Sequence, residues 1–291
     1  MIDVFGSAER FLLGNGRLVE RRLFGALFRG APASGVADAV RGYRNADGGF
    51  GHGMEPDTRC PASLPIYTEV AFQALAVAGV ADAELLGPAC DQLASVSDGD
   101  GAVALASPVI EDCPRAEHWS AWTYERGLNP TAGLAGRLHW LGFEHAWRDA
   151  ATAYTWGKLE AGDFPDEAHL LAELMVFLEH VPDRERADRH AAAVVERLGG
   201  SELFQLDAGA EGYGLTPLTI APLASSRWRA LFGAERIGAH LDRLLADQQA
   251  DGGWPIAWTP PSEAARLEWR GMWTLDALRT LISYGRVPAP R

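Results

Sequence analysis

A turn of the form Asp-Gly-Gly followed by an aromatic residue occurs twice in this chain and constrains its fold more than any other feature. The first copy is Arg44-Asn45-Ala46-Asp47-Gly48-Gly49-Phe50-Gly51, and the second is Gln249-Ala250-Asp251-Gly252-Gly253-Trp254-Pro255. In both, a polar helix end precedes the turn and a more apolar helix follows it. Aspartate hydrogen-bonds its local backbone, and glycine adopts positive φ without a Cβ clash. The repetition predicts helical hairpins, with the aromatic residue filling the gap between the two helices.

Hydrophobic periodicity predicts helices along the whole chain, and helices with one polar face alternate with helices that are apolar on nearly every side. Residues 236–249 and 187–198 each carry an apolar stripe beside charged positions. Residues 70–80 and 170–178 are apolar almost all round, which is typical of helices buried on every side. Convincing strand alternation is absent, so the predicted fold class is all-α. The expected helices lie near residues 3–13, 17–29, 34–44, 64–79, 82–96, 130–142, 143–159, 166–180, 184–198, 216–232, 234–250 and 262–284.

Polar outer helices that alternate with apolar inner helices describe a single α/α toroid, in which about six helical hairpins close into a double-walled ring. Degenerate turns fall between the two clear repeats, at spacings that fit one helical pair plus its loops. No linker divides the chain, so residues 1–291 are expected to form one domain. These degenerate turns are Asp98-Gly99-Asp100-Gly101, Gly162-Asp163-Phe164 and Asp207-Ala208-Gly209.

Charge and cysteine content limit the partners of the protein. The net charge of −13 argues against a nucleic-acid surface or an anionic membrane, because both require concentrated Lys and Arg. The three cysteines, Cys60, Cys90 and Cys113, are widely spaced and form no disulfide framework. The first residues lack the basic and apolar regions of a signal peptide. No apolar run approaches the ~20 residues that a membrane span needs. We therefore expect a cytoplasmic protein with no nucleic-acid partner and no membrane span.

The two repeats resemble the QW-type repeat of the terpenoid cyclase and protein prenyltransferase superfamily. Gln249 with Asp251-Gly252-Gly253-Trp254 matches the repeat, and Asn45 with Asp47-Gly48-Gly49-Phe50-Gly51 resembles a second copy. The resemblance implies an α/α toroid over most of the chain. The repeat residues themselves are scaffold in that superfamily, so the resemblance implies a fold and says little about the reaction.

The chain departs from the superfamily at the motifs that carry chemistry. It has no Asp-x-Asp-Asp acid motif of squalene–hopene-type cyclases, and no Gly-Cys-Gly-Glu-Gln thioester of complement-type toroids. Prenyltransferase β subunits bind zinc through Asp-x-Cys and a distant His, whereas Asp112-Cys113 lacks the spacer. A zinc set of Cys60, Cys113, His52 and His118 has no close pairing to support it. The Asp-Asp-x-x-Asp metal motif of class I terpene synthases is also missing. We therefore expect no metal and no other cofactor.

The resemblance places the N-termini of the inner helices at one mouth of a central cavity, where helix dipoles favour anions. The segment Glu55-Pro56-Asp57-x-Arg59 precedes the first clear inner helix and is the sharpest candidate site. A desolvated carboxyl beside a second one has a raised pKa and is able to donate a proton. Alternatively, Arg59 forms a structural ion pair with Glu55 or Asp57.

Other expected rim segments supply further candidates. Asp112 and His118 join an acid and a titratable imidazole in one long loop, although a surface role for His118 is the alternative. Glu268 and Arg270 either line the cavity or pair with neighbouring helices. Among the remaining histidines, only His169 lies near the expected start of an inner helix. We expect Glu55, Asp57, Asp112 and His118 to be catalytic. The expected substrate-binding residues are Arg59, Trp119, Trp122, Tyr124, Trp254, Trp258, Glu268, Trp269, Arg270 and Trp273.

These residues predict an enzyme with a central, aromatic-lined pocket for a small apolar molecule, of the isoprenoid kind. The reaction would be an acid-initiated cyclisation, isomerisation or dehydration, as in a terpene cyclase-like isomerase or lyase, with tryptophan faces stabilising a carbocation. The chain's own loops or a second subunit, in a homodimer, would close the pocket. Two alternatives stay open. One is a carbohydrate-active lyase or hydrolase on the same toroid, and the other is a non-catalytic module that binds a small molecule.

Overall fold

Helices make up most of the described chain, residues 3–290 of a computed structural model, and the all-α fold class is confirmed. The only strands in this range, β1 (Val103–Ala104) and β2 (Arg126–Gly127), form one short antiparallel pair. Short 3-10 helices lie at η1 (Pro108–Asp112), η2 (Glu117–Ala121) and η3 (Arg227–Phe232). The α-helices are α1 (Val4–Asn15), α2 (Leu18–Phe28), α3 (Ser34–Arg41), α4 (Pro65–Ala78), α5 (Ala83–Ser95), α6 (Leu128–Leu141), α7 (Ala146–Ala161), α8 (Ala168–His180), α9 (Arg184–Gly200), α10 (Pro217–Ile220), α11 (Ala234–Ala246) and α12 (Glu263–Ser283).

Most predicted helices match the observed ones within a few residues, and the predicted helix over 216–232 is wrong. Thr216 caps α10 at its start, but the helix ends after Ile220. Pro222 follows almost at once and has no backbone N–H to continue the hydrogen-bond ladder. The chain then turns and forms η3. By contrast, α12 begins as predicted at Ser262, whose side chain accepts a hydrogen bond from the Ala265 N–H at 3.1 Å.

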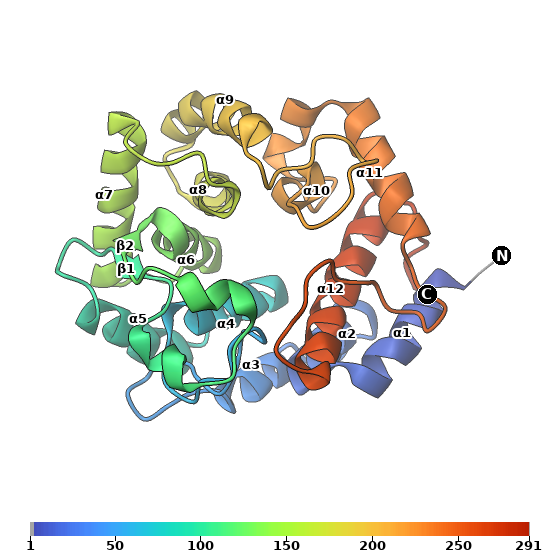
Figure 1. Cartoon of the computed structure of the whole chain (residues 1–291), viewed down its shortest axis with the longest axis horizontal. Coiled ribbons are helices and arrows are strands. Elements are labelled where there is room, and N and C mark those ends of the chain that lie inside the picture. Colours follow the sequence, from blue (N-terminus) through green and yellow to red (C-terminus); the bar gives the residue numbers. More distant parts are fainter. Residues whose placement is uncertain (1–2, 291) are drawn as a thin grey trace.

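The even-numbered helices pack against one another in chain order. α2 contacts α4, α4 contacts α6, α6 contacts α8, and α8 contacts α10. α12 contacts α2, so the last helix meets the first helix of this series. The odd-numbered helices pack on their neighbours in sequence, and α1 packs on α12. Figure 1 shows the even-numbered helices toward the middle of the molecule and the odd-numbered ones toward its edge.

The two Asp-Gly-Gly turns have the same local geometry. In the first, the Asn45 N–H donates to the Gly49 carbonyl at 2.8 Å, and in the second the Gln249 N–H donates to the Gly253 carbonyl at 2.9 Å. In each turn the aspartate accepts a hydrogen bond from the second glycine, at 3.0 and 3.1 Å. The first glycine has a φ of 91° in both. The aromatic residue that follows each turn is buried between helices.

The first glycine of each turn packs against the next odd-numbered helix along the chain. A Cβ at Gly48 would overlap the backbone of Pro88 in α5. A Cβ at Gly252 would overlap the backbone of Ser7, which lies in α1, the first helix of the chain. The degenerate turn between α5 and α6 repeats the contact, because a Cβ at Gly101 would overlap the backbone of α7. These three turns therefore pack closely against α5, α7 and α1.

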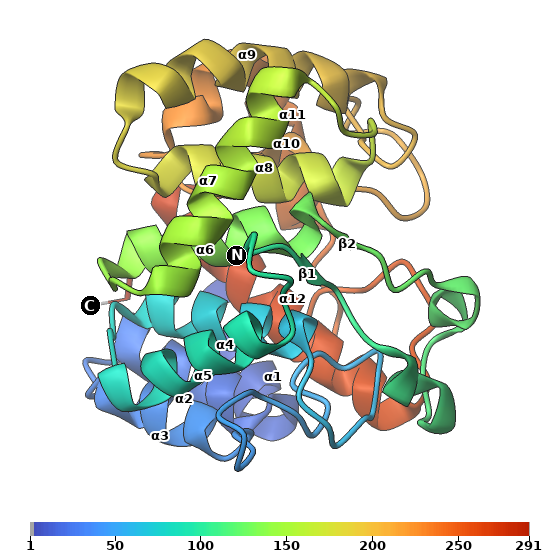
Figure 2. The same cartoon turned by 90° about the vertical axis from the view of Figure 1, so that its left-hand side faces the viewer.

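The long connections that precede α4, α6, α8, α10 and α12 gather on the right-hand side of Figure 2. These connections carry most of the residues that the sequence singles out. No helix in residues 3–290 combines the length and the apolar character that crossing a membrane requires.

Candidate functional site

Two loops that are far apart in sequence are joined by backbone hydrogen bonds, at the end of the molecule where the long connections gather. The first runs from α3 to α4 and contains Asp57, and the second follows η1. The Ala116 N–H donates to the Asp57 carbonyl at 2.8 Å, and the Arg59 N–H donates to the Pro114 carbonyl at 2.9 Å. Tyr67 of α4 anchors the first loop, because its hydroxyl accepts a hydrogen bond from the Cys60 N–H at 3.2 Å. The loop around Asp57 is thus held on both sides.

The Asp57 carboxylate is buried and lies at the centre of the candidate site. Its Oδ2 accepts a hydrogen bond from Trp258 Nε1 at 2.9 Å, and its Oδ1 accepts one from Trp269 Nε1 at 2.8 Å. His118 Nε2 lies 3.8 Å from Oδ2. Burial raises the pKa of Asp57, while the two indole N–H groups and His118 oppose that rise. Burial also lowers the pKa of His118, against the attraction of Asp57. The structure therefore places His118, which the sequence pattern pairs with Asp112, beside Asp57 instead.

Glu55, two residues earlier, has a different environment. Its carboxyl is 5% exposed, and Oε2 accepts hydrogen bonds from the N–H groups of Asp57 at 3.1 Å and Thr58 at 3.2 Å. Burial raises the pKa of Glu55 well above its ordinary value, and the charge of Asp57 raises it further. The two backbone hydrogen bonds and Arg17 lower it, but burial prevails. Burial thus raises the pKa of both neighbouring carboxyls, and Glu55 lacks the indole hydrogen bonds that oppose the rise at Asp57.

Four aromatic rings lie near the Asp57 carboxylate, and two of them bind it. We call these four residues the aromatic cluster: Tyr213, Trp258, Trp269 and Trp273. Trp258 meets Trp269 with ring centroids 5.1 Å apart and an interplanar angle of 80°, and it meets Trp273 at 5.4 Å and 73°. Tyr213 contacts Trp258 edge-on, at 5.3 Å and 77°. Indole faces carry the negative end of the ring quadrupole and attract cations. The cluster and Asp57 together make this end of the molecule a favourable place for positive charge.

Arg59 forms a structural ion pair, but its partner is neither Glu55 nor Asp57. Its guanidinium donates two hydrogen bonds to Glu268 of α12, at 2.5 and 3.1 Å. This pair joins the α3–α4 loop to α12 and compensates both charges. The alternative in which Arg59 pairs with Glu55 or Asp57 is therefore wrong. Glu268 forms an ion pair, and its role in substrate binding stays a prediction. The nearest side chain to Asp57 with a titratable positive charge is His118.

Two residues predicted to bind substrate are buried in the scaffold. Trp254 is 1% exposed, and its Nε1 donates to the Leu244 carbonyl at 2.7 Å. Arg270 is 3% exposed and binds both carboxylate oxygens of Asp251, at 2.8 and 2.7 Å. It therefore ties α12 to the second Asp-Gly-Gly turn. Both side chains are thus buried in hydrogen bonds around the second repeat turn, and their role in substrate binding stays a prediction.

The η1–α6 loop contributes less than the sequence predicts. Asp112 is exposed at the end of η1, and no hydrogen bond or ion pair within residues 3–290 joins it to Asp57. Trp119 is buried and packs against Trp122, which is 37% exposed, with ring centroids 4.8 Å apart. Tyr124 donates a hydrogen bond to Glu111 at 3.1 Å. The structure therefore places His118 near the carboxylate and leaves Asp112 apart from it.

The interior between the even-numbered helices is charged, which differs from the predicted aromatic-lined central pocket. Arg137 of α6 lies 2.7 Å from Glu173 of α8 and 3.1 Å from Glu69 of α4. Burial raises the pKa of Glu69 well above its ordinary value, and the charge of Glu173 adds to this. Gly133, one turn before Arg137, leaves room for the Glu173 carboxylate, which a Cβ would overlap. A large apolar substrate would have to desolvate these charges.

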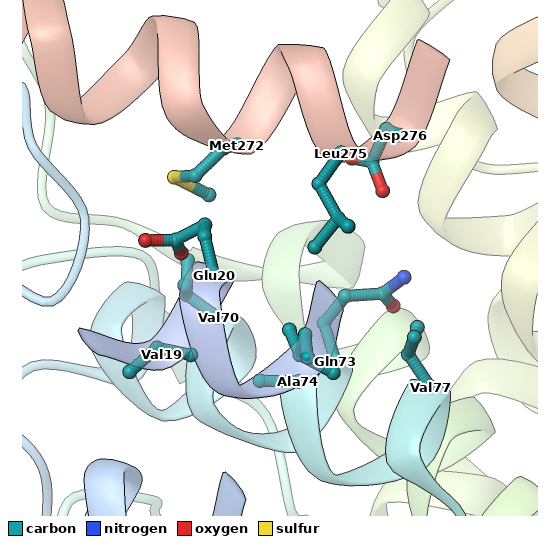
Figure 3. Close-up of a pocket in the computed structure, with 10 residues that line it drawn as sticks. Val19, Glu20, Val70, Gln73, Ala74, Val77, Met272, Leu275 and Asp276 are labelled. Carbon is teal, nitrogen blue, oxygen red and sulfur yellow. The ribbon is translucent and has the colours of Figure 1, made fainter. Parts of the chain in front are cut away.

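A small cavity of about 50 Å³, open to solvent, lies between α2, α4 and α12 (Figure 3). Met272, Leu275 and Asp276 project into it from α12, opposite residues of α2 and α4. Its walls are aliphatic side chains with the polar groups of Glu20, Gln73 and Asp276, and no aromatic residue lines it. The aromatic residues thus gather around Asp57 and not in this helix-lined cavity.

Sequence reasoning missed three residues beside the aromatic cluster. Glu167, His169 and Tyr213 form a chain of hydrogen bonds: Glu167 Oε1 lies 2.7 Å from His169 Nδ1, and His169 Nε2 lies 2.7 Å from the Tyr213 hydroxyl. The one sequence signal was the position of His169 next to the start of α8.

The residues around Asp57 have no metal-binding arrangement. Within residues 3–290, no three His, Cys, Asp or Glu side chains converge as ligands of a metal ion. No family model matches the chain, and no curated protein matches it.

Proposed function

We propose that the chain is an α/α toroid enzyme that starts a reaction by protonating a small, largely apolar molecule bound against the aromatic cluster. The products would arise by isomerisation, cyclisation or loss of water. The observation that carries this proposal is the pair of adjacent buried carboxyls, Glu55 and Asp57. Only Asp57 is stabilised as an anion by indole N–H groups.

Helix packing supports the toroid. From α2 to α10 each even-numbered helix contacts the next one along the chain, and α12 contacts α2, as expected for an inner ring. The turn after α3 docks on α5, and the equivalent turn after α11 docks on α1. If each turn contacts the outer helix of the next hairpin, then the hairpin that follows the last one is the first. A closed ring has this property and an open array of hairpins does not.

In this proposal one carboxyl is the acid, and the other, as a carboxylate, balances the charge of the cation. Where the environments of two titratable groups push their pKa values apart, the group with the higher value serves as the acid. Glu55 is that group, since burial and Asp57 both raise its pKa. In the proposed step, Glu55 gives its proton to an alkene carbon, or to a hydroxyl that then leaves as water. The Asp57 carboxylate and the tryptophan faces stabilise the resulting cation, each face by about 0.5–2 kcal/mol.

The charged interior limits the size of this substrate. A long isoprenoid chain reaching between the even-numbered helices would meet Arg137 and its two carboxylates. Burying such charges against hydrocarbon is costly. A short prenyl alcohol or alkene that stays beside Trp258, Trp269 and Trp273 avoids that cost. The proposed substrate is therefore a small molecule held at the loop end of the toroid.

The test is turnover of short isoprenoids by the purified protein and two isosteric variants. Prenol, linalool and geraniol would be incubated with each protein and the products separated by gas chromatography with mass detection. We expect isomerised or dehydrated products from the wild type and none from Glu55→Gln or Asp57→Asn. Melting temperatures should stay within a few degrees of the wild type. Glu263→Gln is the matched control, because Glu263 is exposed and pairs only with Arg266. Full turnover by Glu55→Gln would refute Glu55 as the acid.

A further inference from the structure

Glu167, His169 and Tyr213 are linked at the start of α8, beside the aromatic cluster. Glu167 caps this helix, because its carboxylate accepts hydrogen bonds from the N–H groups of His169 at 2.9 Å and Leu170 at 2.7 Å. The same carboxylate contacts His169 Nδ1, and His169 Nε2 contacts the Tyr213 hydroxyl. The imidazole and the phenol ring are nearly parallel, with an interplanar angle of 11°. The three groups are therefore ordered along one line of hydrogen bonds.

The charge state of Glu167 sets the direction of these hydrogen bonds. Burial raises the pKa of Glu167, but the hydrogen bonds that its carboxylate accepts from His169 and Leu170 oppose this rise, and the pKa is lowered. An ionised carboxylate only accepts, so His169 Nδ1 carries a hydrogen. In a neutral imidazole Nε2 is then the acceptor, and the Tyr213 hydroxyl donates to it. Burial raises the pKa of Tyr213 to about 12, so the hydroxyl keeps its hydrogen near neutral pH.

Tyr213 lies beside one of the two indoles that bind Asp57. Its ring packs edge-on against Trp258, and the Trp258 N–H is bonded to Asp57. Both Asp57 oxygens accept indole hydrogens, which leaves that carboxylate as a counter-charge. Since the Tyr213 hydrogen points toward His169, the lone pairs of the phenol oxygen are free on the other side.

We propose that Tyr213 is the catalytic residue that accepts the proton lost by the substrate cation, with His169 and Glu167 as positioning residues. This inference rests on the proposed function. A C–H bond next to the cationic carbon breaks and its electron pair forms the new C=C bond. The proton goes to the Tyr213 oxygen while the Tyr213 hydroxyl proton passes to His169 Nε2. Glu167 stabilises the imidazolium, which returns its proton to solvent. The acid, Glu55, and the base are thus different groups.

One experiment tests the direction of the hydrogen bonds without any turnover. Protein labelled with ¹⁵N in histidine would be observed by NMR near neutral pH, with His169→Gln to assign the signals. We expect His169 with hydrogen on Nδ1 and an unprotonated Nε2. In Glu167→Gln that preference should be lost. A neutral His169 with hydrogen on Nε2 in the wild type would overturn the proposal, because Nε2 would have no lone pair for the Tyr213 proton.

A second experiment tests the role of Tyr213 in the reaction. Tyr213→Phe keeps the ring and removes the oxygen, so the protonation step should continue while the cation is captured by water more often. The ratio of alkene to alcohol products should fall by roughly 10²-fold, the lower range for loss of a general base. The control is Tyr284→Phe, whose hydroxyl donates to the Ala221 carbonyl at 2.8 Å, away from the site.

The outcomes separate the two proposals. Unchanged product ratios in Tyr213→Phe, with normal turnover, would overturn the role of Tyr213 and leave the acid step intact. No turnover of any substrate by the wild type would overturn the proposed function and the role of Tyr213 with it. The NMR result would still establish how the three residues are linked. A shift in product ratio in both tyrosine variants would also count against Tyr213, since a general loosening of the fold would then explain it.

Discussion

Replacing Gly48 by alanine tests how the repeat turns hold the hairpins together. Gly48 has a φ of 91°, and a Cβ there would overlap the carbonyl and the Cβ of Pro88 in α5. Gly79, at the end of α4, is a matched control. Its φ is 67°, and a Cβ there would meet no atom within 4 Å. Both substitutions place alanine at positive φ, and only Gly48→Ala also forces α5 away from the turn.

The two effects have separable magnitudes. Alanine at positive φ costs about 1–2 kcal/mol, and the less flexible unfolded chain returns about 0.4–1 kcal/mol. Gly79→Ala should therefore lower the free energy of unfolding by no more than about 1.6 kcal/mol. Overpacking adds about 1–3 kcal/mol where backbone has to move. Gly48→Ala should therefore lose about 1–4.6 kcal/mol. For a large domain this difference is a further decrease in melting temperature of roughly 2–6 °C beyond that of Gly79→Ala.

Urea unfolding followed by far-ultraviolet circular dichroism measures both variants at 25 °C, together with Gly252→Ala. That third variant places the same overlap against Ser7 of α1. If the two turns are equivalent joints of one ring, Gly48→Ala and Gly252→Ala should lose similar amounts, and both should lose more than Gly79→Ala. Equal losses in Gly48→Ala and Gly79→Ala would refute the reasoning, because the contact with Pro88 would then carry no energy.

Two other substitutions probe the interior and the site. Gly133→Ala should cost about 1–3 kcal/mol by chemical denaturation, because the Cβ would displace the Glu173 carboxylate from Arg137; an unchanged midpoint would contradict that packing. Trp258→Phe removes one of two indole hydrogen bonds that oppose the raised pKa of Asp57, so carboxyl ¹³C titration should show that pKa rising further. A lower pKa in Trp258→Phe would contradict the hydrogen bond.

The helices were predictable from the sequence because their determinants are local. Apolar periodicity, a capping side chain such as Ser262 and the glycine turns each act within a few residues. The helix predicted over 216–232 is wrong for a local reason too, because Pro222 has no backbone N–H to continue a helix. The meeting of α12 with α2 and of Gly252 with Ser7 is not local. These contacts join residues from opposite ends of the chain, and the spacing of the turns does not specify them.

The site was predictable only where one short segment of the sequence contains the acidic groups together. Glu55 and Asp57 stood out because proline fixes a short run with two carboxyls just before an apolar helix. Their partners could not be assigned in the same way. Trp269 and Arg270 are adjacent in sequence and look equivalent, yet the turn of the helix directs one to Asp57 and the other to Asp251. Which residue faces which way depends on the packing of α12, and the sequence pattern does not determine it.

The pH dependence of stability distinguishes the roles assigned to Glu55 and Glu167. Burial first, and then the charge of Asp57, raise the folded-state pKa of Glu55 above its ordinary value of 4.5. Glu55 therefore contributes stability below pH 4.5 that is lost as the pH rises toward its folded-state pKa. Glu167 is the opposite case, because its pKa is lowered in the folded state. Its contribution is present above pH 4.5 and is lost only as the pH falls through the folded-state value.

The measurable consequence lies between pH 5 and pH 8. The Gln side chain mimics a protonated Glu55 at every pH, so Glu55→Gln should become progressively more stable relative to the wild type as the pH rises. Each tenfold difference in proton affinity between the folded and unfolded states corresponds to about 1.4 kcal/mol. Over the same range Glu167→Gln should differ from the wild type by a constant amount, since Glu167 is ionised in both states. Urea midpoints at several pH values measure both differences. A Glu55→Gln difference as flat as that of Glu167→Gln would mean that Glu55 is ionised in the folded protein, and a carboxylate already ionised has no proton to give to a substrate.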